Sequence, residues 1–234
     1  MDIRPQVIAH RGASKAEREN TLAAFRRAGE LMADAVELDV RRTRDGAMAV
    51  HHDAHLADGR NIMDIDAADL PPHVPQLAES LDACNDMWVN IEIKNWHEDV
   101  DFDPTDRLAA TVASMLADRG EDNRWVITSF NRATVDAMRT LIPTVRTGWL
   151  TLGVRDEDVR KVARDLANTG HIAMHPWDRF VTQTTIDVCH ENGLQVNVWT
   201  VDDPDRMREL ITMGADGIIT NVPDVALRVR AEFL

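Results

Sequence analysis

The chain has 234 residues, a length that suits one α/β barrel, and its 40 acidic against 26 basic residues give a formal charge of −14. Such an acidic chain repels phosphate backbones, which argues against a nucleic-acid partner. Cys84 and Cys189 lie far apart without metal-ligand spacing, so we expect a reduced, cytoplasmic protein. We find neither a signal peptide nor an apolar stretch of the ~20 residues a spanning helix needs, and therefore expect no stable membrane anchoring.

Short apolar strands alternate with amphipathic helices along the chain. The first strand, VIAHRG, covers 7–12 and is followed by a helix over 21–32 and a strand over 35–40. The later strands are predicted at 87–94, 125–130, 146–151, 171–176, 196–201 and 216–220. The helices between and after them are predicted at 105–119, 132–142, 156–168, 182–192, 204–213 and beyond Pro223. This alternation indicates βαβ units and a parallel sheet.

Eight such strands in a chain of this length favour a closed TIM-type (β/α)8 barrel, with a doubly wound open sheet as the alternative. The first strand is not followed by G-x-G-x-x-G, which weakens the nucleotide-binding open sheet. We find no internal repeat, low-complexity tract or linker, so residues 1–234 are expected to form a single domain.

A β-hairpin interrupts the alternation after the second strand. Asp45-Gly46 is a strong two-residue turn signal, and it would pair Arg44 with Ala47. Asp39 would then face His52, whereas His51 would point to the other side of the hairpin. The polar segment 54–75 that follows is expected to be an irregular loop.

Polar side chains end several of these strands, the position from which barrels draw their catalytic residues. With the second arm of the hairpin, these ends carry His10, Arg11, Glu37, Asp39, His52, Glu92 and Lys94. Carboxylates alone suit a hard cation such as Mg²⁺ or Ca²⁺, Arg and Lys suit a phosphate, and two histidines suit general acid–base chemistry. The set predicts metal-dependent hydrolysis.

Each residue also has a purely structural interpretation. A strand-end carboxylate often bonds a loop or caps a helix, and a single strand histidine is often a hydrogen-bonded core residue. Glu37 and Asp39 are harder to explain this way, because they share one face of a buried strand and repel each other unless a cation lies between them.

The ordered motifs resemble those of the glycerophosphodiester phosphodiesterase family. The matching stretches are HRG (10–12), ENT (19–21), ELDV with T-x-DG (37–46), HHD (51–53), EIK (92–94), WT (199–200) and DGIITNVPD (216–224). They span nearly the whole chain, and their order is more specific than any one of them. The resemblance implies a TIM-type barrel with one divalent cation, Mg²⁺ or Ca²⁺, held by Glu37, Asp39 and Glu92.

The resemblance also implies roles for the remaining polar residues. His10 and His52 would form the acid–base pair, and Arg11 and Lys94 would bind the phosphate. In the mechanism it implies, a glycerol hydroxyl of the substrate attacks phosphorus to give a cyclic phosphate, which water then opens.

Aromatic residues follow several strands. Phe130 and Trp199 resemble family positions that line the glycerol pocket, although core packing explains them equally well. Trp96, Trp177 and His175 also follow strands and are candidates for the pocket rim.

The chain departs from the family pattern in three places. Arg18 precedes ENT where a proline is common, and the arginine that usually follows HHD closely is displaced to Arg60. The segment 54–75 is too short for the small domain that some members insert.

The acidic run 97–106 is expected to be a solvated loop, because its carboxylates are contiguous and lack calcium-loop spacing.

The leading functional hypothesis is a phosphoric diester hydrolase that cleaves small-molecule glycerophosphodiesters to an alcohol and glycerol 3-phosphate. One alternative is a lysophospholipase D or sphingomyelinase D-like lipid phosphodiesterase, which needs an apolar groove that the polar 54–75 loop does not offer. A second alternative is a barrel that binds phosphodiesters without turnover.

Overall fold

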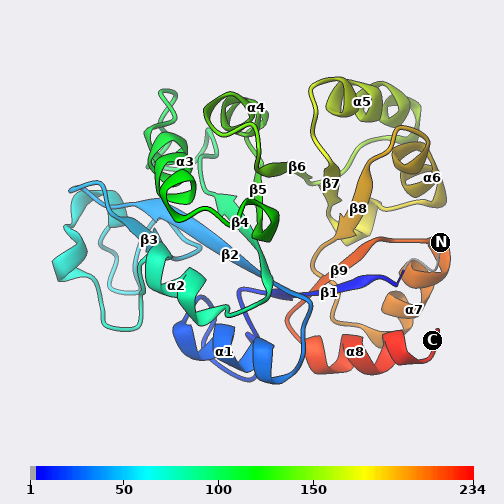
Figure 1. Ribbon diagram of the computed structural model, residues 1–234, viewed down its shortest axis with the longest axis horizontal. Helices are drawn as coiled ribbons and strands as arrows, with labels where there is room; N and C mark the ends of the chain where they lie inside the picture. The colour runs from blue at the N-terminus through cyan, green and yellow to red at the C-terminus, as the bar shows by residue number, and fades with distance from the viewer. Residues whose placement is uncertain (1–3) are drawn as a thin grey trace.

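The computed structural model describes residues 4–234, in which nine strands form one sheet that closes into a barrel (Figure 1). The strands are β1 (Gln6–His10), β2 (Ala35–Arg42), β3 (Met48–Val50), β4 (Trp88–Ile93), β5 (Trp125–Ser129), β6 (Arg146–Thr151), β7 (Ala173–Pro176), β8 (Gln195–Val198) and β9 (Gly217–Thr220). β1 pairs in parallel with both β2 and β9, which closes the ring and excludes the open sheet. β3 pairs antiparallel with the second half of β2. The predicted TIM-type barrel is confirmed.

Helices connect the strands and surround the barrel (Figure 1). They are α1 (Leu22–Glu30), α2 (Leu77–Ala83), α3 (Arg107–Arg119), α4 (Arg132–Leu141), α5 (Asp156–Asn168), α6 (Gln183–Glu191), α7 (Pro204–Met213) and α8 (Pro223–Ala231). Short 3₁₀ turns are η1 (Ile62–Asp64), η2 (Ala67–Asp69), η3 (Asp122–Arg124) and η4 (Asp178–Phe180). None of the helices in residues 4–234 combines the length and apolar character needed to cross a membrane.

The hairpin between β2 and β3 differs from the predicted register by one residue. Among the described residues, the expected cross-strand pairs Arg44–Ala47 and Asp39–His52 do not form. Val40 instead lies opposite Val50, and the turn takes three residues, 44–46. Gly46 adopts a φ of 88°, and a left-handed glycine after a type I turn is the common three-residue hairpin. The two-residue turn prediction is therefore wrong.

The segment 54–75 is irregular as expected, apart from the turns η1 and η2. Several of its apolar side chains point inward, and Leu56, Ile62 and Val74 form a small buried cluster with Ala49 of β3. The helix α2 was not among the predicted elements, because it has only two turns. This helix begins with a capping box, in which the backbone N–H of Gln76 donates to Glu79 Oε1 at 2.9 Å.

The backbone turns sharply where β1 ends, and Gly12 makes this turn possible. Gly12 has a φ of 80°, and its N–H donates to the carbonyl of Ala9 at 3.1 Å. A Cβ atom at this position would lie 2.6 Å from the backbone carbon of Ala24 in α1. The residue is thus constrained twice, by its left-handed conformation and by the close approach of a helix.

We predict that Gly12→Ala lowers the free energy of unfolding by roughly 3 kcal/mol, since left-handed strain costs about 1–2 kcal/mol and overpacking adds about 1–3 kcal/mol. Gly59→Ala is a matched control, because Gly59 has a φ of 86° but a Cβ atom added there would have no neighbour within 4 Å. Urea unfolding should therefore show a larger loss for Gly12→Ala. Equal losses in the two variants would mean that contact with α1 is unimportant.

Candidate active site

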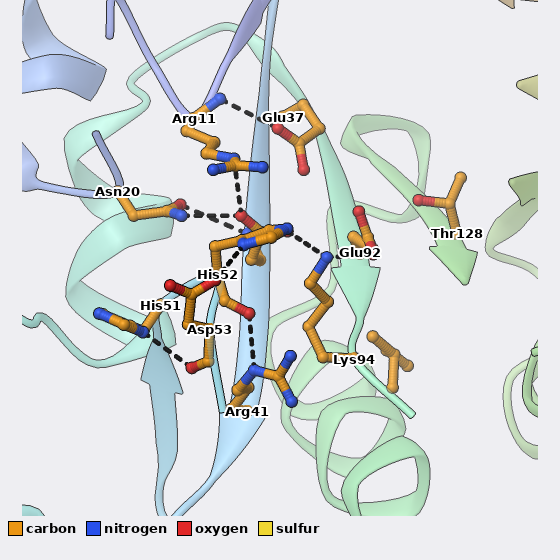
Figure 2. A network of polar contacts seen from close by, with 12 residues as sticks. Arg11, Asn20, Glu37, Arg41, His51, His52, Asp53, Glu92, Lys94 and Thr128 are labelled. Carbon is orange, nitrogen blue, oxygen red and sulfur yellow. Dashed lines mark hydrogen bonds and ion pairs between the residues drawn. The ribbon is translucent and has the colours of Figure 1, made fainter. Parts of the chain in front are cut away.

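β1, β2 and β4, together with the segment after β3, bring the charged site residues to one mouth of the barrel, where Arg11, Glu37, His52, Glu92 and Lys94 lie close together (Figure 2). Strand register places His10 beside Glu37, and Asp39 beside Glu92. One pocket is lined by His10, Arg11, Glu37, His52, Asn90, Glu92, Lys94, Phe130, Leu150, Trp199 and Ile219. Asp39 is the one predicted site residue outside this lining, and it forms ion pairs with Arg11 and Lys94 of the lining.

Arg11 connects the end of β1 to the carboxylates of β2. Its backbone N–H donates to Glu37 Oε2 at 2.9 Å, a contact made possible by the left-handed φ of 56° at Arg11. Its guanidinium lies 3.2 Å from Asp39 and 2.9 Å from Glu19. Ion pairs with Asp39 and with Glu19 thus hold the Arg11 side chain in the mouth of the barrel.

Three buried carboxylates form the centre of the site. Glu37, Asp39 and Glu92 each provide a carboxylate oxygen, and these oxygens lie within 4.8 Å of one another. Burial and the nearby charge of Asp39 raise the pKa of Glu37 well above its ordinary value. Burial also raises the pKa of Glu92. Against burial, Lys94 and Arg11 hold the pKa of Asp39 far below its usual range.

Lys94 is the second cation of this cluster, and its Nζ lies 2.6 Å from Glu92 and 3.1 Å from Asp39 (Figure 2). Although burial opposes it, the two carboxylates raise the pKa of Lys94 above its ordinary value. Two cations face three carboxylates, and Glu37 Oε1 is buried without a hydrogen-bond partner among residues 4–234. An all-oxygen set with excess negative charge fits a hard divalent cation.

His10 is held by a hydrogen-bond chain that begins beside β9. Asp202 accepts from the amide nitrogen of Asn221 at 2.8 Å, which directs the amide oxygen toward His10. That oxygen lies 2.7 Å from His10 Nδ1 and also accepts from Ser14. His10 Nδ1 must therefore carry the proton, which leaves Nε2 unprotonated and 3.9 Å from Glu37. Burial, reinforced by Arg11, lowers the pKa of His10 to about 4.

His52 also lines the pocket, and His51 points away from Glu92 and Lys94 (Figure 2). His52 Nδ1 lies 2.7 Å from the Asp53 carboxylate. His51 lines a neighbouring hollow, where its Nδ1 contacts the Asp53 carbonyl. As expected, His52 faces the pocket and His51 faces away from it. The register that predicted this difference is nevertheless wrong, because both histidines lie beyond the end of β3.

The aromatic residues divide into two groups. Phe130 and Trp199 line the pocket with their ring centroids 5.4 Å apart, and Trp96 and Trp177 extend this pair on either side. His175 does not join them, because it is fully buried and burial lowers its pKa to about 3. His175 is therefore a core residue rather than part of the rim.

The acidic run is less solvated than expected. Asp99 and Asp101 form ion pairs with the buried Arg41 at 3.0 and 2.7 Å, so they bind this segment to β2. The displaced Arg60 pairs with Asp58 on the surface. Within residues 4–234 the only group of acidic, histidine or cysteine side chains close enough to share a metal ion is the one centred on Glu37.

Four further polar residues, which were not predicted as site residues, lie within or beside the matching motifs. Asn20 of the ENT motif donates to Asp39 Oδ2 at 2.8 Å, and Asn221 of DGIITNVPD positions His10. Asp202 and Asp53 complete the hydrogen-bond sets of Asn221 and His52. The position of these residues within or beside the matching motifs was the sequence signal that could have identified them as part of the site.

The chain matches the glycerophosphoryl diester phosphodiesterase family over residues 10–225. It is 30% identical to a glycerophosphodiester phosphodiesterase of Caldanaerobacter subterraneus, over 95% of this chain and 96% of that protein. It is 32% identical to a probable glycerophosphodiester phosphodiesterase 2 of Mycobacterium tuberculosis, over 93% and 88% of the two chains.

Solved structures share the same fold. A putative glycerophosphoryl diester phosphodiesterase of Silicibacter pomeroyi superposes with a TM-score of 0.86 at 25% identity, covering 100% of this chain and 95% of that one. An Oleispira antarctica phosphodiesterase in complex with the product sn-glycerol-3-phosphate gives 0.86 at 23% identity, covering 96% of each chain. The motif order, the barrel and the family match agree, and the chain belongs to the glycerophosphoryl diester phosphodiesterase family.

Proposed function

We propose that the protein is a metal-dependent hydrolase that cleaves glycerophosphodiesters to an alcohol and glycerol 3-phosphate. The observation that carries this proposal is the convergence of three buried carboxylates, two cations and two histidines at one mouth of the barrel, where all of them except Asp39 line one pocket. A relative that is 30% identical is named for this activity, and a structural neighbour holds its product.

A divalent cation fits the cluster of Glu37, Asp39 and Glu92, since Glu37 Oε1 is a buried acceptor without a partner among the described residues. We propose Mg²⁺ or Ca²⁺, both of which prefer oxygen ligands. When bound, the cation would neutralise charge that develops on the phosphate oxygens. Arg11 and Lys94 are the cations placed to bind the same phosphate, and Arg11 can offer two parallel donors.

The two histidines have different surroundings, which assigns them different roles in our proposal. His10 has a free Nε2 and a neutral amide partner, so it would accept the proton of the attacking glycerol hydroxyl. Burial lowers the pKa of His52, whereas its hydrogen bond to the Asp53 carboxylate favours the imidazolium, so His52 would protonate the departing alcohol. Phe130 and Trp199 would contact the glycerol.

Several broader expectations stay predictions. These are a single domain over residues 1–234 and a reduced, cytoplasmic location, with which the free and buried Cys84 and Cys189 are consistent. A phosphodiester-binding barrel without turnover would retain the pocket but release no product.

We predict that the purified protein releases glycerol 3-phosphate from glycerophosphocholine and glycerophosphoethanolamine, and that a chelator abolishes the release. Coupled oxidation of glycerol 3-phosphate measures it directly. Binding of these diesters without product, in the presence of Mg²⁺ or Ca²⁺, would instead identify a binding protein.

We predict that Glu37→Gln weakens divalent-cation binding by at least about tenfold, because a neutral amide replaces one of three charged ligands. Calorimetric titration with Mn²⁺, Mg²⁺ or Ca²⁺ measures the affinity. Glu98→Gln serves as the control, since Glu98 is exposed and lies outside the cluster. Unchanged affinity in Glu37→Gln would exclude this residue as a ligand.

We predict that His52→Ala lowers kcat at least about a hundredfold, the low end for general acid–base catalysis. His51→Ala is the matched control and should retain kcat within about threefold, because His51 faces the neighbouring hollow. Loss of turnover in His51→Ala with normal turnover in His52→Ala would reverse the assignment.

We predict that Asn221→Ala lowers kcat about tenfold or more with little change in KM, since His10 loses the acceptor that fixes its tautomer. Asn221→Asp, which retains an acceptor oxygen for His10, should recover part of kcat. If both variants changed only KM or thermal stability, Asn221 would not position His10 for catalysis.

A further inference from the structure

A second cavity, of about 310 Å³, lies at the opposite end of the barrel from the candidate active site. Residues at or near the amino-terminal ends of the strands line it, and none of them also lines the active-site pocket. Arg146 at the start of β6 lines this cavity, whereas Leu150, four residues and about 13 Å further along the strand, lines the pocket. We call it the lower cavity, and its lining includes Arg4, Gln6, Trp88, Asn123, Arg146 and Asn197.

Apolar side chains inside the barrel separate the lower cavity from the active site. Ile8, Ala35 and Ile219 form a buried cluster, and Trp88 and Trp199 pack against it. Of these two tryptophans, Trp88 lines the lower cavity and Trp199 lines the active-site pocket. A molecule in the lower cavity would therefore not contact the three carboxylates of the active site.

Arg146 brings a cation to the lower cavity without an acidic partner among residues 4–234. Its Nη2 donates to the backbone carbonyl of Asn123 at 2.6 Å, and its guanidinium carbon lies 5.9 Å from the centroid of the Trp88 ring. Its Nε is buried without a hydrogen-bond partner in this part of the chain. Burial lowers the pKa of Arg146, and no neighbouring carboxylate opposes this effect. Because a partly buried charge without a counterion is unfavourable, a bound anion would be stabilising here.

Arg4 is the second cation of the lower cavity, and its nearest carboxylate is already occupied. The guanidinium of Arg4 lies 3.9 Å from Asp34. Asp34 also pairs with the buried Arg230 and accepts from the backbone N–H of Val7 at 2.7 Å. The charge of Arg4 is therefore only weakly neutralised by the protein.

The acidic side of the lower cavity is small and occupied as well. Among the described residues that line it, only Asp216 is acidic. The Asp216 carboxylate accepts from the backbone N–H of Val196 at 2.7 Å and lies 2.9 Å from His190 Nε2. The lower cavity thus has an excess of positive charge, although the whole chain has a formal charge of −14.

Neutral amides complete the polar lining. Asn197 is only 5% exposed, and its amide nitrogen lies 2.9 Å from Nε2 of the fully buried His175. Burial lowers the pKa of His175 to about 3, so the neutral ring accepts from this amide and leaves the amide oxygen of Asn197 for another donor. The side-chain oxygen of Gln6 accepts from the indole N–H of Trp88 at 3.3 Å, which leaves its amide nitrogen as a donor. Such amides can bind hydroxyl groups.

We propose that the lower cavity binds a small hydroxylated phosphate monoester, such as glycerol 3-phosphate, at a site separate from the catalytic pocket. A phosphate monoester carries close to two negative charges at neutral pH, which match Arg4 and Arg146, whereas a phosphodiester carries one. The planar donor set of arginine suits phosphate oxygens, and the amides of Gln6 and Asn197 suit the hydroxyl groups. This inference goes beyond the proposed function, because binding in the lower cavity requires no turnover.

The test is a calorimetric titration with glycerol 3-phosphate in the presence of EDTA. Arg11→Gln is the background, because it weakens phosphate binding in the catalytic pocket and leaves the lower cavity unchanged. We expect this variant to bind one equivalent, and a further Arg146→Gln substitution to weaken binding at least about tenfold by removing a charged hydrogen-bond donor. Arg4→Gln should weaken binding about threefold, and it cannot disturb the core because the Arg4 side chain is 52% exposed.

Arg160→Gln is the matched control, since Arg160 is an exposed arginine of α5 that pairs with Glu191 outside the lower cavity, and it should leave the affinity unchanged. The inference is overturned if Arg11→Gln alone abolishes binding, or if the Arg146→Gln and Arg160→Gln variants bind equally well. Binding of inorganic phosphate or malate as tight as that of glycerol 3-phosphate would also overturn it, because the site would then not select a phosphate ester. Failure of the metal-loaded protein to hydrolyse glycerophosphocholine, with this binding intact, would contradict only the proposed function.

Discussion

The burial of three carboxylates at the barrel mouth is the constraint on which the rest of the site depends. Glu37, Asp39 and Glu92 come from adjacent strands, so the closed sheet forces their charges together. Burial raises the cost of each charge, and the proximity of the three adds repulsion. Arg11 and Lys94 offset part of this cost, and a divalent cation would offset the remainder.

Other features of the mouth follow from the need to hold these charges. The glycine turn after β1 brings the Arg11 backbone and side chain to the carboxylates, and Asn20 donates to Asp39. The amide of Asn221 is oriented by Asp202, and it in turn orients His10. Neutral amides thus surround the charged centre and fix its geometry without adding charge.

Much of this arrangement could be predicted from local patterns. Alternation along a strand placed Glu37 with Asp39 and Glu92 with Lys94 on shared faces, and strand–helix alternation predicted the barrel. The hairpin register could not be predicted, because Asp45-Gly46 fits both a two-residue turn and the observed turn over 44–46.

Contacts between segments that are far apart in the chain could not be predicted from local sequence patterns either. Asn221 reaches His10 only because β9 closes the barrel against β1, over a separation of 211 residues. Asp99 and Asp101, in the loop after β4, likewise pair with Arg41 of β2 instead of remaining solvated. Trp96, Phe130, Trp177 and Trp199 stand out at strand ends in the sequence, but their contacts with one another form only when the barrel closes.

The most direct test of this account is anomalous diffraction from crystals soaked in Mn²⁺. We predict a single strong peak with oxygen atoms of Glu37, Asp39 and Glu92 at about 2.0–2.4 Å, the range of hard-cation contacts. Absence of density there at saturating Mn²⁺, with Lys94 still bridging Asp39 and Glu92, would contradict it. The carboxylate cluster would then be a structural ion-pair network rather than a metal centre.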